Sequence, residues 1–145
     1  MAVIGLIAVG LAIGVRGAPR RADRLESAFL DLLRCEVDQA ILFVRPRLSR
    51  VKFLQFPRYK KDDGSLGIKL AFPYAAWSVD YFPQVVTEAS KRGLSYEVDG
   101  TGNVVDRFVF VRFDESVDQA ADFAKFILLD VFGFDANYSF RIRIN

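Results

Sequence analysis

Apolar residues recur along this chain at the spacings of helices and strands, with turn residues between the segments. From residue 19 to residue 44 the apolar side chains follow three- and four-residue steps, which predicts an amphipathic helix. Pro19 suits the first turn of such a helix, and Pro46 ends the segment. The sequence therefore predicts an amphipathic helical segment over 18–46, followed by an α+β domain over 47–145.

Within the domain over 47–145, two blocks share one plan. Strand, Ser-Val-Asp, helix, Gly and strand occur twice in that order. Joined by a turn at 99–103, the blocks give the β-α-β-β-α-β order of a ferredoxin-like (split β-α-β) antiparallel sandwich, whose sheet an earlier hairpin strand extends. The predicted elements are strands at 51–56 and 66–72, a helix at 81–92, strands at 94–98 and 104–113, a helix at 116–132 and a strand at 138–144.

A second placement of the same segments makes the last strand irregular. The order is then helix, three strands, helix, two strands and helix, which resembles the fold of type III secretion chaperones. The resemblance rests on the order of the elements alone. This interpretation corresponds to a soluble, chaperone-like dimer in which the N-terminal apolar run, residues 1–15, is buried at a subunit contact.

The N-terminal apolar run, Met1 to Val15, contains no charged and no strongly polar side chain. As a helix this run is about 22 Å long, against a bilayer core of about 30 Å. Extension through Gly17 and Ala18, with Arg16 reaching the headgroups, makes a short span workable. We therefore interpret residues 1–17 as a transmembrane anchor. A buried helix of a soluble protein and a signal peptide are the alternatives, although no basic residue precedes the apolar run as it does in a signal peptide.

Basic residues follow the apolar run at once. Arg16, Arg20, Arg21 and Arg24 lie beyond its C-terminal end, so the positive-inside rule places the folded domain on the cytoplasmic side. The same four arginines form the predicted membrane-surface site, with anionic lipid headgroups as partners. The single Cys35 agrees with a reducing compartment.

Gly10 and Gly14 have the spacing that lets two transmembrane helices approach closely, so they are the predicted helix-packing residues. They indicate other membrane protein subunits as partners. The charge distribution agrees with a membrane location. Residues 16–61 hold 12 Lys and Arg against 5 Asp and Glu, whereas residues 62–145 hold 8 against 13. The half of the chain that follows the anchor is thus the basic half.

Side chains that carry common chemistry are scarce. The chain has no histidine and one cysteine, which removes the usual neutral-pH general base, the commonest metal ligand and a cysteine-based zinc site. The glycines within 100–102 fall in a predicted hairpin turn and not in a phosphate-binding loop. The acidic pairs at 62–63 and 114–115 lack further ligands at a cation-binding spacing. We therefore expect no catalytic residue, no metal and no cofactor, and a protein that is not an enzyme.

Basic and aromatic side chains gather in the predicted hairpin loop at 57–65. The glycine- and aromatic-containing motif of RNA-binding sheets is absent, which argues against nucleic acid as a partner. We predict one protein contact at this loop and a second protein contact at Trp77. The alternative role of Trp77 is to anchor the hydrophobic core. The partner-contact candidates are Arg58, Tyr59, Lys60, Lys61 and Trp77.

Together these features predict a membrane-anchored, non-catalytic accessory or scaffold subunit of a larger membrane protein assembly, which acts by protein-protein contact. One alternative is a small-ligand-binding or enzymatic α+β domain, which requires a pocket with converging polar groups. The other is the soluble secretion-chaperone-like dimer.

Overall fold

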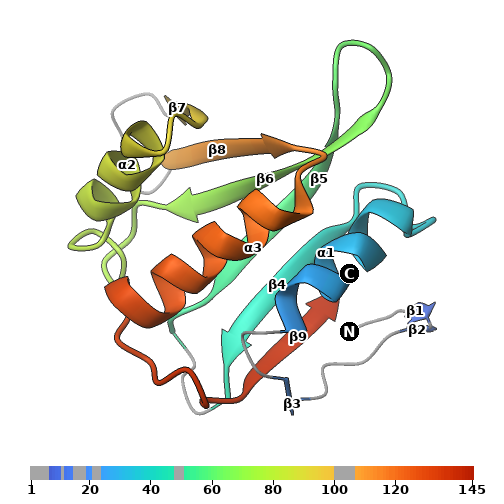
Figure 1. Cartoon of the computed structure of the whole chain (residues 1–145), viewed down its shortest axis with the longest axis horizontal. Helices are drawn as coiled ribbons and strands as arrows, with labels where there is room; N and C mark the ends of the chain where they lie inside the picture. The colour runs from blue at the N-terminus through green and yellow to red at the C-terminus, as the bar shows by residue number, and fades with distance from the viewer. Residues whose placement is uncertain (1–6, 11, 15–18, 21–23, 48–50, 100–106) are drawn as a thin grey trace.

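The computed structural model describes residues 7–10, 12–14, 19–20, 24–47, 51–99 and 107–145. The fold is α+β, with three helices packed on one face of an antiparallel sheet (Figure 1). The last helix continues as a π-helical segment, η3. The elements are β1 (Ile7–Gly10), β2 (Ala12–Gly14), β3 (Pro19–Arg20), α1 (Leu25–Arg34), β4 (Ile41–Pro46), β5 (Leu54–Lys60), β6 (Leu66–Pro73), α2 (Phe82–Lys91), β7 (Ser95–Asp99), β8 (Phe108–Asp114), α3 (Val117–Lys125), η3 (Phe126–Val131) and β9 (Phe140–Ile144).

The main sheet has the strand order β3-β9-β4-β5-β6-β8-β7, and all neighbouring strands are antiparallel. Six of these strands form the body of the sheet, whereas β3 adds two residues beside β9. β1 and β2 pair with each other in a separate sheet. The strand order leaves β7 at one end of the main sheet.

Alternating burial along the strands explains why the helices cover one face. In β8, Val109, Val111 and Phe113 are buried, while Phe110 and the other residues between them are partly exposed. β4 and β9 show the same alternation. The buried side chains meet the helices, as where Phe29 of α1 packs edge-on against Phe56 of β5 with ring centroids 4.8 Å apart. Burying one such side chain stabilises the fold by about 1.5–3 kcal/mol.

The helices also contact one another above this face. Nζ of Lys125 in α3 lies 3.3 Å from Oε2 of Glu26 in α1. Arg92, directly after α2, lies over the rings of Phe123 and Phe126, at 5.5 and 5.3 Å from their centroids. All three helices therefore lie on the same side, and within the described part of the chain no helix covers the opposite face.

The α+β class and the antiparallel sheet predicted from the sequence are confirmed. β6, α2 and β7 form the predicted split β-α-β unit, because β8 lies between β6 and β7. The last strand differs from the ferredoxin-like order, which would place it beside β6. Instead β9 pairs with β4. The cause is that β4 and β5 are inserted into the sheet on that side of β6.

The helix expected over 19–44 is shorter in the structure. α1 ends at Arg34, and part of the remaining segment forms β4. Gln39 has a φ angle of 54°, which belongs to a turn and not to a helix. The apolar residues Ala40 and Phe43 fit the spacing of a continued helix, but here they belong to the entry and the middle of a strand. Periodicity alone does not separate these two possibilities.

From α1 to α3 the elements follow the order of the second placement: helix, three strands, helix, two strands, helix. β9 then completes the sheet as a regular strand. The helix expected over 116–132 is found as α3 and η3. Ser116 caps it, because its hydroxyl oxygen accepts a hydrogen bond from the backbone N–H of Gln119 at 3.3 Å. Gly133, with a φ angle of 81°, follows its end.

Most of the predicted anchor lies outside the described residues, which omit 1–6, 11 and 15–18. Gly10 is the last residue of β1, and Gly14 is the last residue of β2. Within the described ranges, no helix has the length and apolar character needed to cross a membrane.

Arg58 of β5 holds the C-terminal end of α1. Its Nη1 donates to the carbonyl oxygen of Leu32 at 2.9 Å and also to that of Cys35, and its Nη2 donates to the carbonyl oxygen of Val37 at 2.6 Å. Carbonyls at a helix C-terminus lack partners within the helix, and they favour a nearby cation. Arg58 therefore fixes the turn that leads from α1 into β4.

Replacing Arg58 with Met removes these donors and keeps much of the aliphatic side chain. We expect the free energy of unfolding to fall by about 2 kcal/mol, because hydrogen bonds from a charged donor contribute about 1.5–3 kcal/mol. Urea unfolding followed by circular dichroism measures the loss. Arg34→Met, at an exposed position in the last turn of α1, is the matched control and should cost less than about 0.5 kcal/mol. Equal losses in both variants would contradict the role of Arg58.

Candidate functional site

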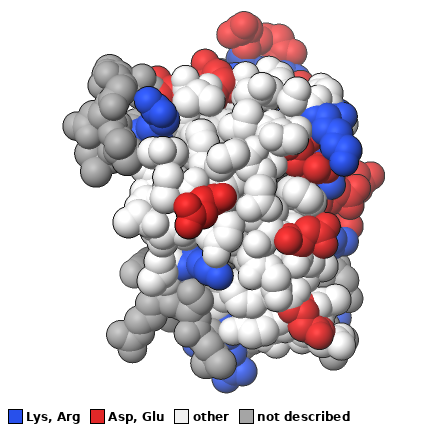
Figure 2. Space-filling model, turned by 90° about the vertical axis from the view of Figure 1, so that its left-hand side faces the viewer, with Lys and Arg blue, Asp and Glu red and all other residues white. Residues whose placement is uncertain are grey.

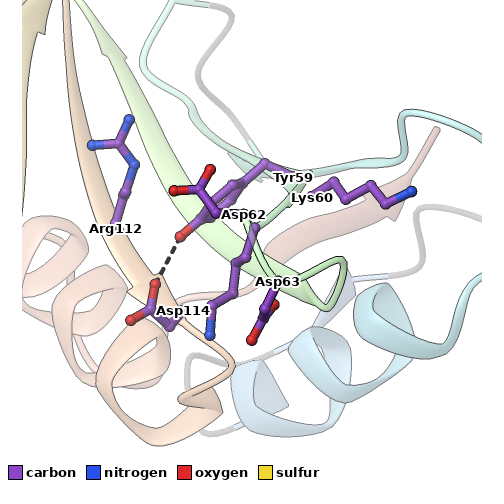
Figure 3. A pocket seen from close by; sticks show the side chains of 7 residues that line it. Tyr59, Lys60, Asp62, Asp63, Arg112 and Asp114 are labelled. Atoms are coloured by element: carbon purple, nitrogen blue, oxygen red, sulfur yellow. Dashed lines mark hydrogen bonds between the residues drawn. The ribbon is translucent and has the colours of Figure 1, made fainter.

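An open cavity of about 520 Å³ lies at the end of the β5–β6 hairpin (Figure 3). Within it, Oη of Tyr59 donates a hydrogen bond to Oδ1 of Asp114 at 2.8 Å. Figure 3 shows these two side chains directed at each other, whereas Lys60 extends away from Asp114. Gly67 pairs with Tyr59 in the sheet and gives the ring room, because a Cβ there would lie 2.9 Å from Cε1 of Tyr59. The cavity is lined by Tyr59, Lys60, Lys61, Asp62, Asp63, Arg112 and Asp114.

Several charged groups of the cavity are paired within the protein. Nζ of Lys61 lies 2.7 Å from Oε2 of Glu115, and this hydrogen bond raises the pKa of Lys61. Asp63 accepts hydrogen bonds from the hydroxyl and the backbone N–H of Ser65, at 2.6 and 2.9 Å, and both lower the pKa of Asp63. These contacts hold the turn between β5 and β6 in one conformation.

Tyr59 is protonated at neutral pH. Burial raises its pKa to about 12, and the hydrogen bond to Asp114 and the negative charge of Asp114 add to the effect. Its hydroxyl therefore acts as a hydrogen-bond donor that ties β5 to the end of β8. Within the described residues, no three His, Cys, Asp or Glu side chains gather closely enough to hold a metal ion. Tyr59 and Asp114 pair with each other inside the cavity, whereas Lys61, Asp63 and Arg112 bind Glu115, Ser65 and Glu97, which do not line it. The clearest effect of these contacts is to fix the hairpin.

Tyr59→Phe keeps the ring beside Gly67 and removes the hydroxyl. At neutral pH we expect the free energy of unfolding to fall by about 1 kcal/mol. The pKa of Tyr59 is about 12 in the folded protein, against about 10 in an unfolded chain, so this contribution is complete below pH 10 and is lost as the pH rises toward 12. Urea unfolding between pH 8 and 12 should show the difference from the wild type shrinking. Tyr96→Phe is the control, and a difference for Tyr59→Phe that stays constant with pH would refute the assignment.

The second surface of interest is β7, the strand that forms one edge of the main sheet. All five of its residues are exposed. Tyr96 and Val98 retain 37% and 50% of their accessible surface, although their register partners Val111 and Val109 are fully buried. Figure 2 views the molecule from the side of α2 and β7 and shows mainly uncharged surface with scattered charges. Two apolar side chains are thus presented at the sheet edge.

The other face of β7 is acidic. Glu97 and Asp99 alternate with Tyr96 and Val98, and they lie opposite Phe110 and Phe108 of β8. Oε1 of Glu97 is 2.5 Å from Nη2 of Arg112, and the Glu97 side chain is still 55% exposed. The edge therefore combines an apolar pair on one face of the sheet with two carboxylates on the other.

Within the described residues, no strand pairs with the outer edge of β7. Natural edges are commonly protected by charged side chains, above all Lys, by Pro, by a bulge or by a covering segment. The segment Ser-Tyr-Glu-Val-Asp contains no Lys and no Pro, its charged residues are the two acids, and its register with β8 is unbroken from Ser95 to Asp99. At the opposite end of the sheet, β3 covers part of β9. In the part of the chain that the structure describes, the outer edge of β7 thus has no strand partner.

The structure separates the predicted partner-contact residues. Tyr59, Lys60 and Lys61 line the hairpin cavity together. Arg58 binds the end of α1 and is engaged within the fold. Trp77 packs against the core, where its ring lies 5.4 Å from that of Phe53 and 5.9 Å from that of Phe72. Of the predicted membrane-surface residues, Arg20 belongs to β3, Arg24 precedes α1, and Arg16 and Arg21 lie outside the described residues.

The sequence predicts a strand at 94–98, and the structure has it as β7, but the pattern did not indicate that every residue of this strand is exposed. The alternation of polar and apolar residues in this segment is typical of any half-buried strand. Its exposure follows from the strand order, which local sequence does not reveal. Comparison with protein-family models, with curated proteins and with solved structures finds no match to this chain.

Proposed function

We propose that this protein is a membrane-anchored, non-catalytic accessory subunit that acts by protein-protein contact, with β7 as its contact edge. The observation that carries the proposal is the exposure of every residue of β7, including Tyr96 and Val98, on a regular strand whose outer edge has no strand partner within the described residues. An extended segment of a partner can add to such a strand through main-chain hydrogen bonds, with side-chain contacts on both faces.

Residues 1–17 provide the attachment in this proposal. Their apolar run is followed by arginines on the C-terminal side only, and this sequence pattern supports a membrane anchor with the domain on the cytoplasmic side. The described parts of the run pair as the strands β1 and β2, so the proposal requires them to become helical in the bilayer. In that helical form, the spacing of Gly10 and Gly14, which end β1 and β2 in the structure, would allow close contact with a second membrane helix. A contact in the bilayer and a second one at β7 would act together, because the first raises the effective concentration for the second.

A soluble, secretion-chaperone-like dimer is the second candidate. The order of the elements from α1 to α3 favours it. In that case the N-terminal apolar run lies at a subunit contact and not in a membrane. Both candidates act by protein contact, and fractionation distinguishes them.

Deleting residues 1–17 tests the attachment. We expect the full chain to sediment with membranes and to resist a carbonate wash, because the apolar run inserts into the bilayer. The shortened protein should be soluble and folded, since the elements from α1 onward share one core. Fractionation and circular dichroism measure both properties. If the shortened protein aggregates and loses the native circular dichroism spectrum, the apolar run belongs to the core. If the full chain stays in the soluble fraction, the result favours the soluble dimer.

Val98→Lys tests the contact edge, because Lys is a residue that protects natural edge strands. We expect the amount of companion subunits recovered with this chain from membranes to fall about tenfold. The free energy of unfolding of this chain should change by less than about 0.5 kcal/mol. Quantitative mass spectrometry of the tagged full chain measures the companions. Val37→Lys is the matched control, since Val37 is 39% exposed and lies in the turn after α1.

If the companion subunits remain bound in both variants, the contact is not at β7. A wild-type protein that is monomeric and shows turnover dependent on one of its carboxylates would replace the subunit proposal with the enzymatic alternative.

A further inference from the structure

The two faces of β7 differ in chemistry, and this difference specifies the partner. We propose that β7 accepts an extended segment of another protein in which basic residues alternate with apolar residues. The basic side chains would lie beside Glu97 and Asp99, and the apolar ones beside Tyr96 and Val98. The inference rests on the proposed function, because it names the chemistry of the segment that binds at the same edge.

The alternation follows from strand geometry. Successive side chains of an added strand point to opposite faces of the sheet, and those that share a face with β7 contact its side chains. On one face they meet the exposed surface of Tyr96 and Val98. On the other they meet the two carboxylates, where opposite charges are favourable and like charges are unfavourable.

β8 shows that a cation on a neighbouring strand can reach this position. Arg112 of β8 lies across from β7, and its Nη2 is 2.5 Å from Oε1 of Glu97. A carboxylate has several acceptor sites, and the Glu97 side chain is 55% exposed. A basic residue on an added strand would approach Glu97 from the other side of β7 without displacing Arg112.

The fold itself contains a strand of the proposed type. In β9, Phe140, Ile142 and Ile144 are buried under the helices, while Arg141 and Arg143 point to the opposite face. This orientation matches β7, whose apolar residues lie on the helix side and whose acids lie on the other. The sequence of β9 is therefore a suitable probe for the edge.

A second copy of this chain fits the edge poorly. Antiparallel pairing of two β7 strands about their central residue places Glu97 directly opposite Glu97 of the other copy, which is unfavourable. β9 of a second copy is not open along its length, because Pro19 and Arg20 of β3 pair with Arg141 and Phe140. The charge pattern thus favours a segment of a different protein.

The test measures peptide binding to the purified full chain in detergent by fluorescence anisotropy. The probe is a labelled synthetic peptide that copies residues 138–145, and its counterpart carries Glu at both Arg positions. We expect the Arg peptide to bind about tenfold more tightly than the Glu peptide, with a preference that weakens as salt is added. An Arg peptide with alternate backbone amides methylated should not bind, because it cannot donate main-chain hydrogen bonds to β7.

Asp99→Lys should weaken binding of the Arg peptide about tenfold and strengthen binding of the Glu peptide. Asp80→Lys is the matched control, since Asp80 is an exposed residue before α2, and it should leave both affinities unchanged. Binding that survives amide methylation, or that Asp99→Lys leaves unaltered, would overturn the inference.

The outcomes also separate this inference from the proposed function. If both peptides bind equally and Val98→Lys abolishes both, β7 is the contact edge but its charge preference is refuted. If neither peptide binds, the partner chemistry is refuted, and the effect of Val98→Lys on the native complex then decides the proposed function. Self-association of the full chain that Val98→Lys abolishes would make a second copy the occupant and overturn the inference.

Discussion

The attachment of Arg58 to the end of α1 is the interaction on which the arrangement of the sheet depends. The guanidinium group donates hydrogen bonds to the carbonyl oxygens of Leu32, Cys35 and Val37, and so it completes the hydrogen bonding where the helix ends. The chain then reverses through Gln39 into β4, which pairs with β5, the strand that carries Arg58. β9 joins the free side of β4, and β7 is left as the opposite edge.

Elements with a strong local pattern were predictable from sequence. The helix of α3 and η3 combines a Ser116 cap, regularly spaced apolar residues and a Gly133 stop, and each of these signals acts within a few residues. The segment after α1 was not predictable in the same way, because the apolar spacing around Ala40 and Phe43 satisfies both a helix and a strand. The contact that resolves the ambiguity comes from Arg58, about twenty residues further along the chain.

The candidate site shows the same division between local and distant causes. The basic and aromatic hairpin was predictable from the sequence. The hydrogen bonds of Tyr59 and Lys61 were not predictable, because their partners lie 55 and 54 residues away along the chain. The exposure of Tyr96 and Val98 likewise depends on which strands lie beside β7. Arg112 connects the two places, since it contacts Glu97 at the edge and lies 6.0 Å from the ring centroid of Tyr59.

The proposed use of β7 as a contact edge has a consequence for the amount of this protein that a cell should make. An edge strand that recruits one partner also offers its main chain to any extended segment that is present at high concentration. The two carboxylates of β7 repel acidic segments and favour basic ones, but they give no discrimination among the different basic segments. If a partner binds at β7 as proposed, copies made in excess of that partner are exposed to misassembly and proteolysis. Under the same proposal, the edge stays selective when this chain and its partner are produced in balanced amounts.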